Sequence, residues 1–229
     1  MRLSAAFFYH HDSFPSGHFP LTAESLNPQQ KSVFREYAEA IIIALLLALF
    51  IRTFVVQAFK IPSSSMEPTL LVGDHLLVNK FGYGIRNPFT GAAWIPIGTP
   101  QRRDIIVFKF PLNPSLDFIK RVVGVEGDRI EVINKKVFVN GKPFEVDSAV
   151  HRDPNIFAPG VSARDNFGPV VVPPHSLFVM GDNRDNSHDS RFWKFVDLRA
   201  VKGKAFVLYW SWDSEDFAVR WHRIGQLIH

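Results

Sequence analysis

The sequence predicts a mainly β protein, in which antiparallel sheets form a partly closed, barrel-like domain with a smaller β insert behind a single transmembrane α-helix. Three observations predict this fold: one long apolar segment near residue 45, many short segments rich in Val, Ile and Phe after residue 60, and 16 prolines spread along 229 residues. Because 46% of the residues are hydrophobic, the chain can bury a sizeable core, and disorder is a poor description of the whole.

The apolar segment is long enough to cross a bilayer. Ala40–Ile51 are twelve consecutive apolar residues, and the apolar character resumes at Phe54. We therefore expect a transmembrane anchor over residues 38–59, about 33 Å long as a helix. Arg52 can extend its charge to the interface near one end. Residues 1–37, which include His10 and His11, are expected to form a tail without regular structure.

Two other interpretations of this segment stay open. A buried core helix is disfavoured because the segment is hydrophobic on all sides. A cleavable signal peptide is compatible with the small-x-small sequence Val56-Gln57-Ala58, but the 39 residues before the apolar run make an unusually long leader. The charges before the segment are nearly balanced, so they leave its orientation open.

Residues 60–229 are predicted to form the β domain. Asn140-Gly141 is a hairpin signal, since this turn needs positive φ at both residues. The inserted excursion is expected over about residues 127–174, of which 145–174 are Pro-rich and irregular. Short strands are predicted at Leu76–Asn79, Asp104–Phe110, Asp117–Glu126, Arg129–Ile133, Lys136–Val139, Ser176–Met180 and Ala205–Trp210.

Composition narrows the function classes. The net charge is +4 without a long cationic run, which gives nucleic-acid binding little support. A mildly basic domain at a membrane favours anionic phospholipid head groups instead. The chain has no cysteine, which excludes disulfides, thiol catalysis and cysteine metal sites.

Two features suggest nucleophilic catalysis. A run of serines, Ser63-Ser64-Ser65, follows the apolar segment closely. In the later stretch Phe118–Val123, strand alternation places one of two adjacent cations, Lys120 or Arg121, on an apolar face. Burial lowers the pKa of a lysine, and a neutral amine can accept a proton from a serine hydroxyl. Taken alone, such a lysine more often lies at a strand edge with its charge in solvent.

The polar stretch Gly181–Arg191 is the third feature. Calcium binding is disfavoured because the EF-hand pattern is absent and Arg184 would repel a cation. A triad that uses His188 is also disfavoured, because neighbouring residues cannot easily hydrogen-bond in series. A rigid polar loop with internal Asp–Arg pairs, which orients Ser187 or another hydroxyl, is the better interpretation.

Together these features resemble the bacterial type I signal peptidases, also called leader peptidases. The resemblance covers roughly residues 34–228. Five ordered blocks behind the apolar segment carry it: Ile61–Leu70, Gly73–Val78, Arg103–Phe108, Asp117–Val122 and Gly181–Arg191. Ser64 departs from the pattern, since relatives often have Gly there.

The resemblance implies a residue-by-residue assignment. Ser65 corresponds to the nucleophile and Lys120 to the general base. Ser63 corresponds to the side-chain donor that joins the Ser65 backbone N–H in the oxyanion hole, and Ser187 to the hydroxyl that orients the lysine. The structural ion pair behind the site corresponds to Asp189 and Arg191. The substrate pockets correspond to Phe59, Ile61, Met66, Leu70, Val107, Asp117, Phe118 and Ile119.

The resemblance further implies a membrane-bound serine endopeptidase with a Ser–Lys dyad, which cleaves N-terminal signal peptides from exported preproteins after Ala-x-Ala-type sites. It implies no cofactor and no metal. It places a monomeric, single-pass protein in the bacterial cytoplasmic (inner) membrane, with the catalytic domain on the outer side and residues 1–37 in the cytoplasm. The aromatic stretch Phe81–Pro100 is expected either to dip into the interface or to pack over the barrel.

Two alternatives to this function remain. One is a dedicated pilus or conjugation maturation peptidase with a single substrate. The other is a non-catalytic envelope protein that binds preproteins on the same scaffold.

Overall fold

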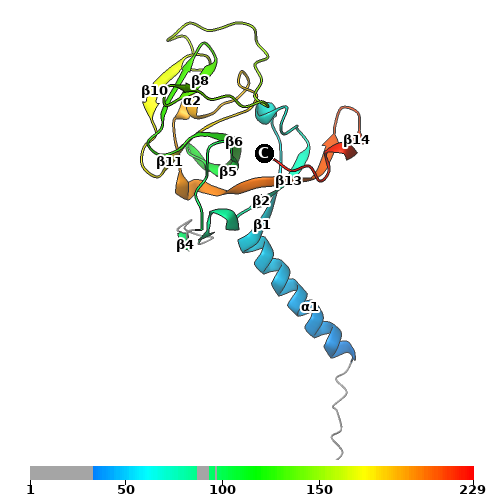
Figure 1. Ribbon diagram of the computed structural model, residues 1–229. Coiled ribbons are helices and arrows are strands. Elements are labelled where there is room, and N and C mark those ends of the chain that lie inside the picture. The colour runs from blue at the N-terminus through cyan, green and yellow to red at the C-terminus, as the bar shows by residue number, and fades with distance from the viewer. Residues whose placement is uncertain (1–32, 87–92, 96) are drawn as a thin grey trace, which may run out of the picture. The chain divides into compact units, whose positions relative to one another are not determined.

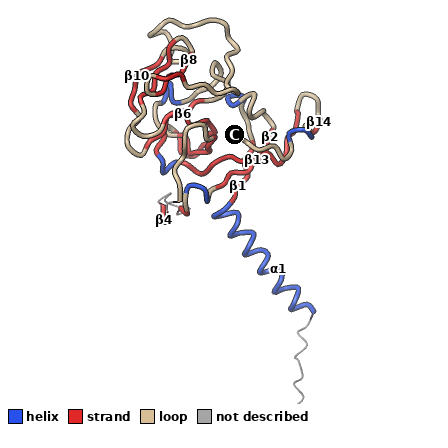
Figure 2. Tube along the Cα trace, viewed as in Figure 1, coloured by secondary structure: helices blue, strands red, loops and turns tan. Residues whose placement is uncertain are grey.

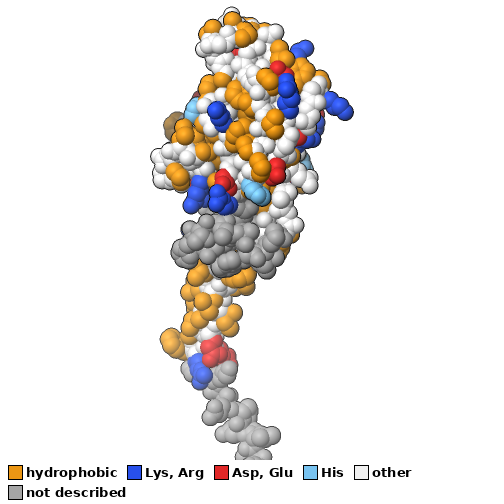
Figure 3. All heavy atoms as spheres, turned by 90° about the vertical axis from the view of Figure 1, so that its left-hand side faces the viewer, with side chains coloured by type: hydrophobic (Ala, Val, Ile, Leu, Met, Phe, Trp, Pro, Cys, Tyr) orange, Lys and Arg blue, Asp and Glu red, His pale blue; other side chains and the backbone are white. Residues whose placement is uncertain are grey.

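An apolar helix leads into the folded domain. The computed structural model describes residues 33–86, 93–95 and 97–229, so most of the predicted tail lies outside the described residues. Helix α1 comprises Val33–Phe50 and continues as a π-helical turn, Ile51–Val55. These 23 residues have a mean hydropathy of 2.3, and none of α1 is buried. In Figure 3 the visible side chains along this helix are mostly hydrophobic, with charged ones near its N-terminal end.

The helical segment ends earlier than the predicted anchor. Val56–Lys60 form strand β1, which pairs antiparallel with β2, Asp74–Asn79. Phe59 lies opposite Leu76 in this pair and packs against the domain core. The last four residues of the predicted anchor are therefore not helical, because their backbone groups and the Phe59 side chain are used by the sheet.

The main sheet joins eight of the described strands in antiparallel pairs (Figure 1). Their order is β1-β2-β13-β5-β6-β11-β12, and β14 pairs with β13. No pairing joins β1 to β12 in the described part of the chain, so the sheet is open, as expected for a partly closed barrel. The remaining strands of this sheet are β5 (Ile105–Phe110), β6 (Asn113–Gly124), β11 (Ser176–Met180), β12 (Val196–Asp197), β13 (Val201–Asp213) and β14 (Ala218–Val219).

The predicted insert forms a sheet of its own. Its order is β10-β7-β8-β9, and its strands are β7 (Arg129–Ile133), β8 (Lys136–Val139), β9 (Lys142–Pro143) and β10 (Phe167–Val171). Asn140 and Gly141 join β8 to β9 at φ values of 53° and 77°, which confirms the hairpin signal. A long loop, residues 144–166, connects β9 to β10 (Figure 2).

All seven predicted strands are present, although several have shifted ends. The sequence missed β10, because Gly and Pro interrupt its hydrophobic pattern. Two short segments of the stretch Phe81–Pro100 pair antiparallel, Ile85–Arg86 with Ala93–Ile95, while residues 87–92 and 96 of it lie outside the described residues. The short elements outside the two larger sheets are β3 (Ile85–Arg86), β4 (Ala93–Ile95) and helix α2 (Ser190–Trp193).

Alternating side chains divide the described core into three clusters. One is mainly aliphatic and includes Met66 and Leu70, a second contains Phe108 and Trp193, and the third fills the insert. Strand β6 borders all three, since Ile119 packs on the first, Val122 lies in the second and Val123 in the third. This strand also carries Lys120, so the lysine lies where the cores meet.

Candidate active site

Ser65 is held in a short 3-10 turn, Ser64–Met66, between β1 and β2. Met66 and Leu70 are fully buried in the aliphatic core, and the Leu70 N–H donates to the Met66 carbonyl at 2.9 Å. These apolar contacts fix the segment that follows Ser65. The Ser65 side chain itself is nearly buried, at 8% exposure.

Lys120 projects from β6 onto this turn. Its Nζ donates hydrogen bonds to Ser65 Oγ at 2.7 Å and to the Ile119 carbonyl at 3.0 Å. Lys120 is only 4% exposed, and its Nζ lies 5.4 Å from the centre of the Phe118 ring. The two side chains singled out in the sequence are therefore in direct contact, although 55 residues separate them in the chain.

Burial lowers the pKa of Lys120 to about 8. Loss of hydration penalises the ammonium form, while the charges of Asp189 and Asp182 oppose this effect and that of Arg191 adds to it. A lysine with this pKa is partly neutral near pH 8. Its free amine can then accept the proton of a serine that already lies at hydrogen-bond distance.

Ser63 lies beside the turn. Its Oγ is 3.5 Å from Ser65 Oγ, and the residue is exposed. The N–H of Ser65 is the second of the 3-10 turn, so it has no acceptor within that turn. Both predicted oxyanion donors are thus found next to the hydroxyl of Ser65.

The polar loop Gly181–Asn186 holds the serine turn from one side. The Asn183 N–H donates to the Ser65 carbonyl at 3.1 Å, and Asn183 Nδ2 donates to the Ser64 carbonyl at 3.1 Å. Asn186 Nδ2 donates to Ser64 Oγ at 2.9 Å. Sequence analysis assigns no role to these two asparagines, because only the fold brings their loop to Ser64 and Ser65.

Ser187 occupies a different arrangement from the implied one. The hydrogen bonds of Lys120 Nζ go to Ser65 Oγ and to the Ile119 carbonyl, so the implied bond to Ser187 is not formed among the described residues, and the buried Ser187 hydroxyl lies by the Asp189 carboxylate instead. Ser187 nevertheless lies close to the site, since a Cβ built on Gly181 would be 2.3 Å from both Ser187 Oγ and the Ser65 carbonyl oxygen. His188 next to it is exposed and stacks on Phe192.

Asp189 and Arg191 form a buried ion pair, as implied. Arg191 Nη2 and Nε lie 2.8 and 2.9 Å from the Asp189 carboxylate, which also accepts from the Gly181 N–H at 3.1 Å. Burial alone would raise the pKa of Asp189, but the Arg191 charge and these hydrogen bonds lower it overall. The pair therefore stays ionised and braces Gly181, where the polar loop begins.

A second buried ion pair was not predicted. Arg121, next to Lys120, donates to Asp182 through Nε at 2.8 Å and through Nη2 at 2.7 Å. The Thr69 hydroxyl also donates to Asp182. Strand alternation suggested one buried cation of the two, but both Lys120 and Arg121 are buried because Asp182 neutralises the second.

The residues proposed for the pockets fall into two groups. Most gather in the aliphatic cluster that contains Met66, while Phe118 packs on the aromatic cluster and Asp117 pairs with Lys202 at 2.7 Å. Met66 and Leu70 have no exposed surface, so they support the others from behind. The members of the aliphatic group are Phe59, Ile61, Met66, Leu70, Val107 and Ile119.

Comparison with known proteins decides the family. A family model described as signal peptidase, peptidase S26, matches residues 34–210. The chain belongs to this family. It is therefore a hydrolase, a peptidase of the S26 family. Its mainly β fold confirms the prediction from the sequence.

Relatives in this family match most of the chain. Signal peptidase I of Pseudomonas aeruginosa is 37% identical over 223 residues, which cover 84% of this chain and 78% of that protein. Signal peptidase I of Aquifex aeolicus is 36% identical over 228 residues, with 77% and 84% covered. A solved signal peptidase I from Enterococcus faecalis aligns with 47% of this chain and 97% of its own at 30% identity and a TM-score of 0.38.

Proposed function

We propose that this chain is a membrane-anchored serine endopeptidase that removes N-terminal signal peptides from exported preproteins after Ala-x-Ala-type sites. The observation that carries the proposal is the 2.7 Å hydrogen bond between Lys120 Nζ and Ser65 Oγ, in a site where burial lowers the lysine pKa to about 8. The names of the relatives supply the substrate class, since they are signal peptidases.

Acylation follows from this contact. Neutral Lys120 takes the proton from Ser65 as its Oγ attacks the scissile carbonyl, and a tetrahedral oxyanion forms. The Ser65 N–H and the Ser63 hydroxyl stabilise this oxyanion. The Lys120 ammonium then returns the proton to the leaving amine. The mature protein departs with a new N-terminus, and the signal peptide remains as an ester on Ser65.

Deacylation repeats the same steps with water. Lys120, neutral again, takes a proton from a water molecule that attacks the ester carbonyl. A second oxyanion occupies the same donors, and its collapse expels Ser65 Oγ, which recovers the proton from Lys120. The signal peptide leaves with a free carboxylate, and no cofactor or metal enters the reaction.

Specificity is assigned to the aliphatic group beside Ser65. Phe59 and Ile119 are its partly buried members, so they present the surface that small residues of the substrate would contact. Each surplus methylene is rejected by only about 1–3 kcal/mol, so two small pockets must act together to select Ala-x-Ala. Met66 and Leu70 keep these pockets shallow from behind.

The apolar helix would hold the enzyme at the membrane, where its substrate is also held. Helix Val33–Val55 would be about 34 Å long, enough to cross the hydrocarbon core. A signal peptide is itself held in the bilayer, so anchoring raises the effective concentration of the substrate. We place the protein as a monomer in the bacterial inner membrane, with its catalytic domain on the outer side, near anionic phospholipids.

The test uses detergent-solubilised protein and a preprotein with one Ala-x-Ala site. Wild type, Ser65→Ala and Lys120→Ala are compared by the size and the N-terminal sequence of the product. Cleavage at that site by wild type alone is expected. A preprotein whose two alanines are replaced by bulky residues is the substrate control and should stay intact.

The alternatives give different results. Lack of cleavage by a folded wild type, combined with binding of the preprotein, would favour the non-catalytic envelope protein. Cleavage of only one among many exported preproteins would favour the dedicated maturation peptidase. Full cleavage by Lys120→Ala would remove the lysine from the mechanism.

A further inference from the structure

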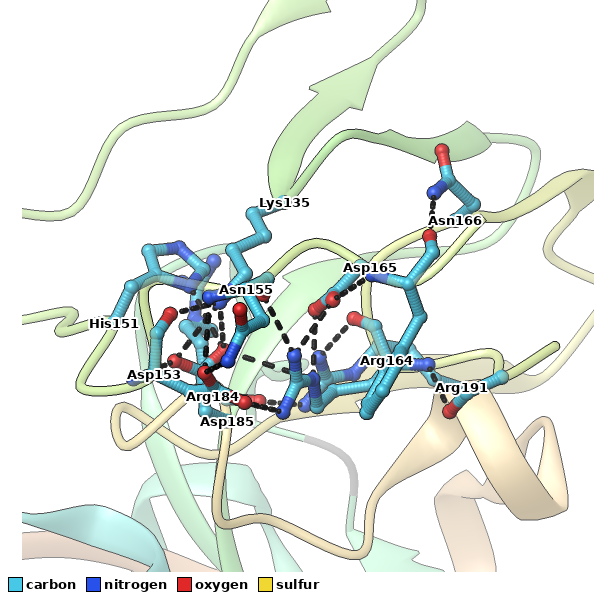
Figure 4. Close-up of polar contacts among 12 residues, drawn as sticks. Lys135, His151, Asp153, Asn155, Arg164, Asp165, Asn166, Arg184, Asp185 and Arg191 are labelled. Carbon is cyan, nitrogen blue, oxygen red and sulfur yellow. Dashed lines mark hydrogen bonds and ion pairs between the residues drawn. The ribbon is translucent and has the colours of Figure 1, made fainter. Parts of the chain in front are cut away.

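A cluster of charged residues lies on the side of the polar loop that faces the insert (Figure 4). Its centre is Asp185, and we call it the Asp185 cluster: Lys135, His151, Asp153, Arg164 and Asp185. The Asp185 carboxylate accepts from Lys135 Nζ at 3.0 and 3.1 Å, and His151 Nδ1 lies 3.2 Å away. It also accepts from the backbone N–H of Asp153 at 2.8 Å. One carboxylate thus binds three separate points of the insert.

These partners come from two parts of the insert that are themselves joined. Lys135 lies at the tip of the β7–β8 hairpin, and its N–H donates to the Asp165 carbonyl at 2.9 Å. Arg164 binds the carboxylates of both Asp153 and Asp165, at 2.6 and 2.7 Å, and its Nε lies 3.9 Å from Asp185. The hairpin tip and the 144–166 loop therefore meet the polar loop as one braced unit.

The backbone reinforces this junction. The Val150 N–H donates to the Asp182 carbonyl at 2.8 Å, and the Arg184 N–H donates to the Val150 carbonyl at 3.0 Å. These two bonds form a parallel bridge between the 144–166 loop and the polar loop. The insert is thus attached to Asp182–Asp185, directly beside the asparagines that hold the serine turn.

The polar loop Gly181–Asn186 also binds the serine turn, on the side away from the insert. Asn183 binds the carbonyls of Ser64 and Ser65, and Asn186 binds the Ser64 hydroxyl. Asp185 lies between these two asparagines in the chain, and among the described residues its carboxylate binds the insert rather than the serine turn. It acts on that turn only through the loop it belongs to.

We propose that Asp185 is a positioning residue for acyl transfer: by binding the insert, it fixes the loop whose asparagines hold Ser64 and Ser65 in register with Lys120. The proposal rests on the function proposed above. It gives the insert a catalytic purpose, since the insert supplies no group to the site yet determines where the serine turn lies.

The charges around Asp185 support a mechanical role. Neighbouring Arg184 is 3% exposed, and its Nε and Nη2 have no partner among the described residues. Arg164 keeps Asp153 and Asp165 as partners, whereas Lys135, at 10% exposure, lies 3.0 Å from the Asp185 carboxylate. Without the charge of Asp185, the Lys135 ammonium would stay largely buried beside a neutral group, so the loop should move rather than stay in place.

The experiment compares Asp185→Asn, Lys135→Met and His151→Ala with wild type on the Ala-x-Ala preprotein. Lys136→Met is the matched control, because Lys136 follows Lys135 in the same hairpin but is exposed and outside the cluster. Competent enzyme is counted with a slowly hydrolysed serine-acylating probe, so that kcat refers to folded molecules. Ser65→Ala gives the background.

A small displacement of a nucleophile is enough to slow acyl transfer greatly. We expect kcat to fall about tenfold in Asp185→Asn and about threefold in Lys135→Met, with KM within about twofold of wild type. The midpoint of the pH profile should not move, because Asp185 is not among the charges that set the pKa of Lys120. His151→Ala should lose the least, since its ring is 35% exposed.

Wild-type kcat per competent molecule in both Asp185→Asn and Lys135→Met would overturn the proposal, even if their thermal unfolding midpoints fall. An equal loss of kcat in Lys136→Met would also overturn it. If Asp185→Asn does not fold, Lys135→Met and His151→Ala decide the matter. If wild type does not cleave at all, the proposed function fails and this inference fails with it. If wild type cleaves and Asp185→Asn and Lys135→Met keep its kcat, only this inference fails.

Discussion

Arg121 donates two hydrogen bonds to Asp182, and this buried ion pair ties the strand that carries Lys120 to the loop that holds Ser65. Neither side chain has more than 3% exposure. The segments that carry Ser65 and Lys120 are therefore connected by a charge pair that is almost fully shielded from water.

Asp182→Asn should cost about 3–5 kcal/mol of the free energy of unfolding, because it leaves the Arg121 charge buried without a counter-charge. Denaturant unfolding of wild type and variant measures the difference. Asp197→Asn is the matched control, since its partner Arg199 is 80% exposed and surface pairs of this kind contribute little to stability. Equal losses in the two variants would contradict the role of the buried pair.

Lys120→Met should abolish cleavage and stabilise the fold at pH 7. The folded-state pKa of about 8, against an ordinary 10.5, corresponds to a cost of about 3 kcal/mol for burying the charged form. That cost is complete below pH 8 and disappears as pH rises to 10.5, because lysine is then neutral in both states. Since the hydrogen bond to Ser65 is lost, a net gain of about 1–3 kcal/mol is expected near pH 7, and it should shrink in unfolding measurements toward pH 10.

The pH dependence of kcat/KM should follow the neutral fraction of Lys120. We expect a rise of about tenfold per pH unit on the acidic side and a plateau above a midpoint near pH 8. Initial rates on a peptide with a single Ala-x-Ala site, taken from pH 5 to pH 9.5, test this expectation. A flat profile between pH 5 and pH 9 would remove Lys120 as the base.

Ser63→Ala should lower kcat by about 100-fold or more, which matches the loss of one oxyanion donor at about 3 kcal/mol. KM should change little, because the oxyanion exists only during the reaction. Ser63→Thr keeps the hydroxyl and serves as the control. Full activity in Ser63→Ala would assign the oxyanion to other donors.

Gly181→Ala should slow acylation at least about tenfold. The added Cβ would lie 2.3 Å from the Ser65 carbonyl oxygen, which belongs to the backbone and cannot move aside without displacing the nucleophile. Gly225→Ala is a useful comparison, since nothing lies within 4 Å of its Cβ and its positive φ costs stability without touching the site. Similar acylation rates in Gly181→Ala and wild type would show that the polar loop can move to make room for the added Cβ without displacing Ser65.

The predicted anchor shows what a local hydrophobic pattern can predict and what it cannot. The apolar run is read correctly as a membrane-length helix, since hydrophobicity is a property of each residue. The pattern predicts its end at Phe59, four residues too late, because Val56, Ala58 and Phe59 are apolar whether they lie in a helix or a strand. Pairing with β2, a partner further along the chain, decides between the two.

The same limit applies to the site. Ser65 and Lys120 were found as separate chemical signals, and the fold brings them to 2.7 Å. Strand alternation predicts that only one of Lys120 and Arg121 is buried, since it cannot show that Asp182 neutralises the other. Asn183, Asp185 and Asn186 belong to the polar stretch Gly181–Arg191, but their spacing does not predict which segments they bind.

By itself, the sequence determined the fold class, the apolar helix, the hairpin at Asn140-Gly141 and the residue types needed for Ser–Lys chemistry, because these depend on side chains and on neighbours close in the chain. Only the tertiary structure decided that Lys120 is buried with a lowered pKa, that Ser187 does not bond to it here, and that the insert binds Asp185. The physical reason is that burial and charge pairing depend on contacts between segments far apart in sequence.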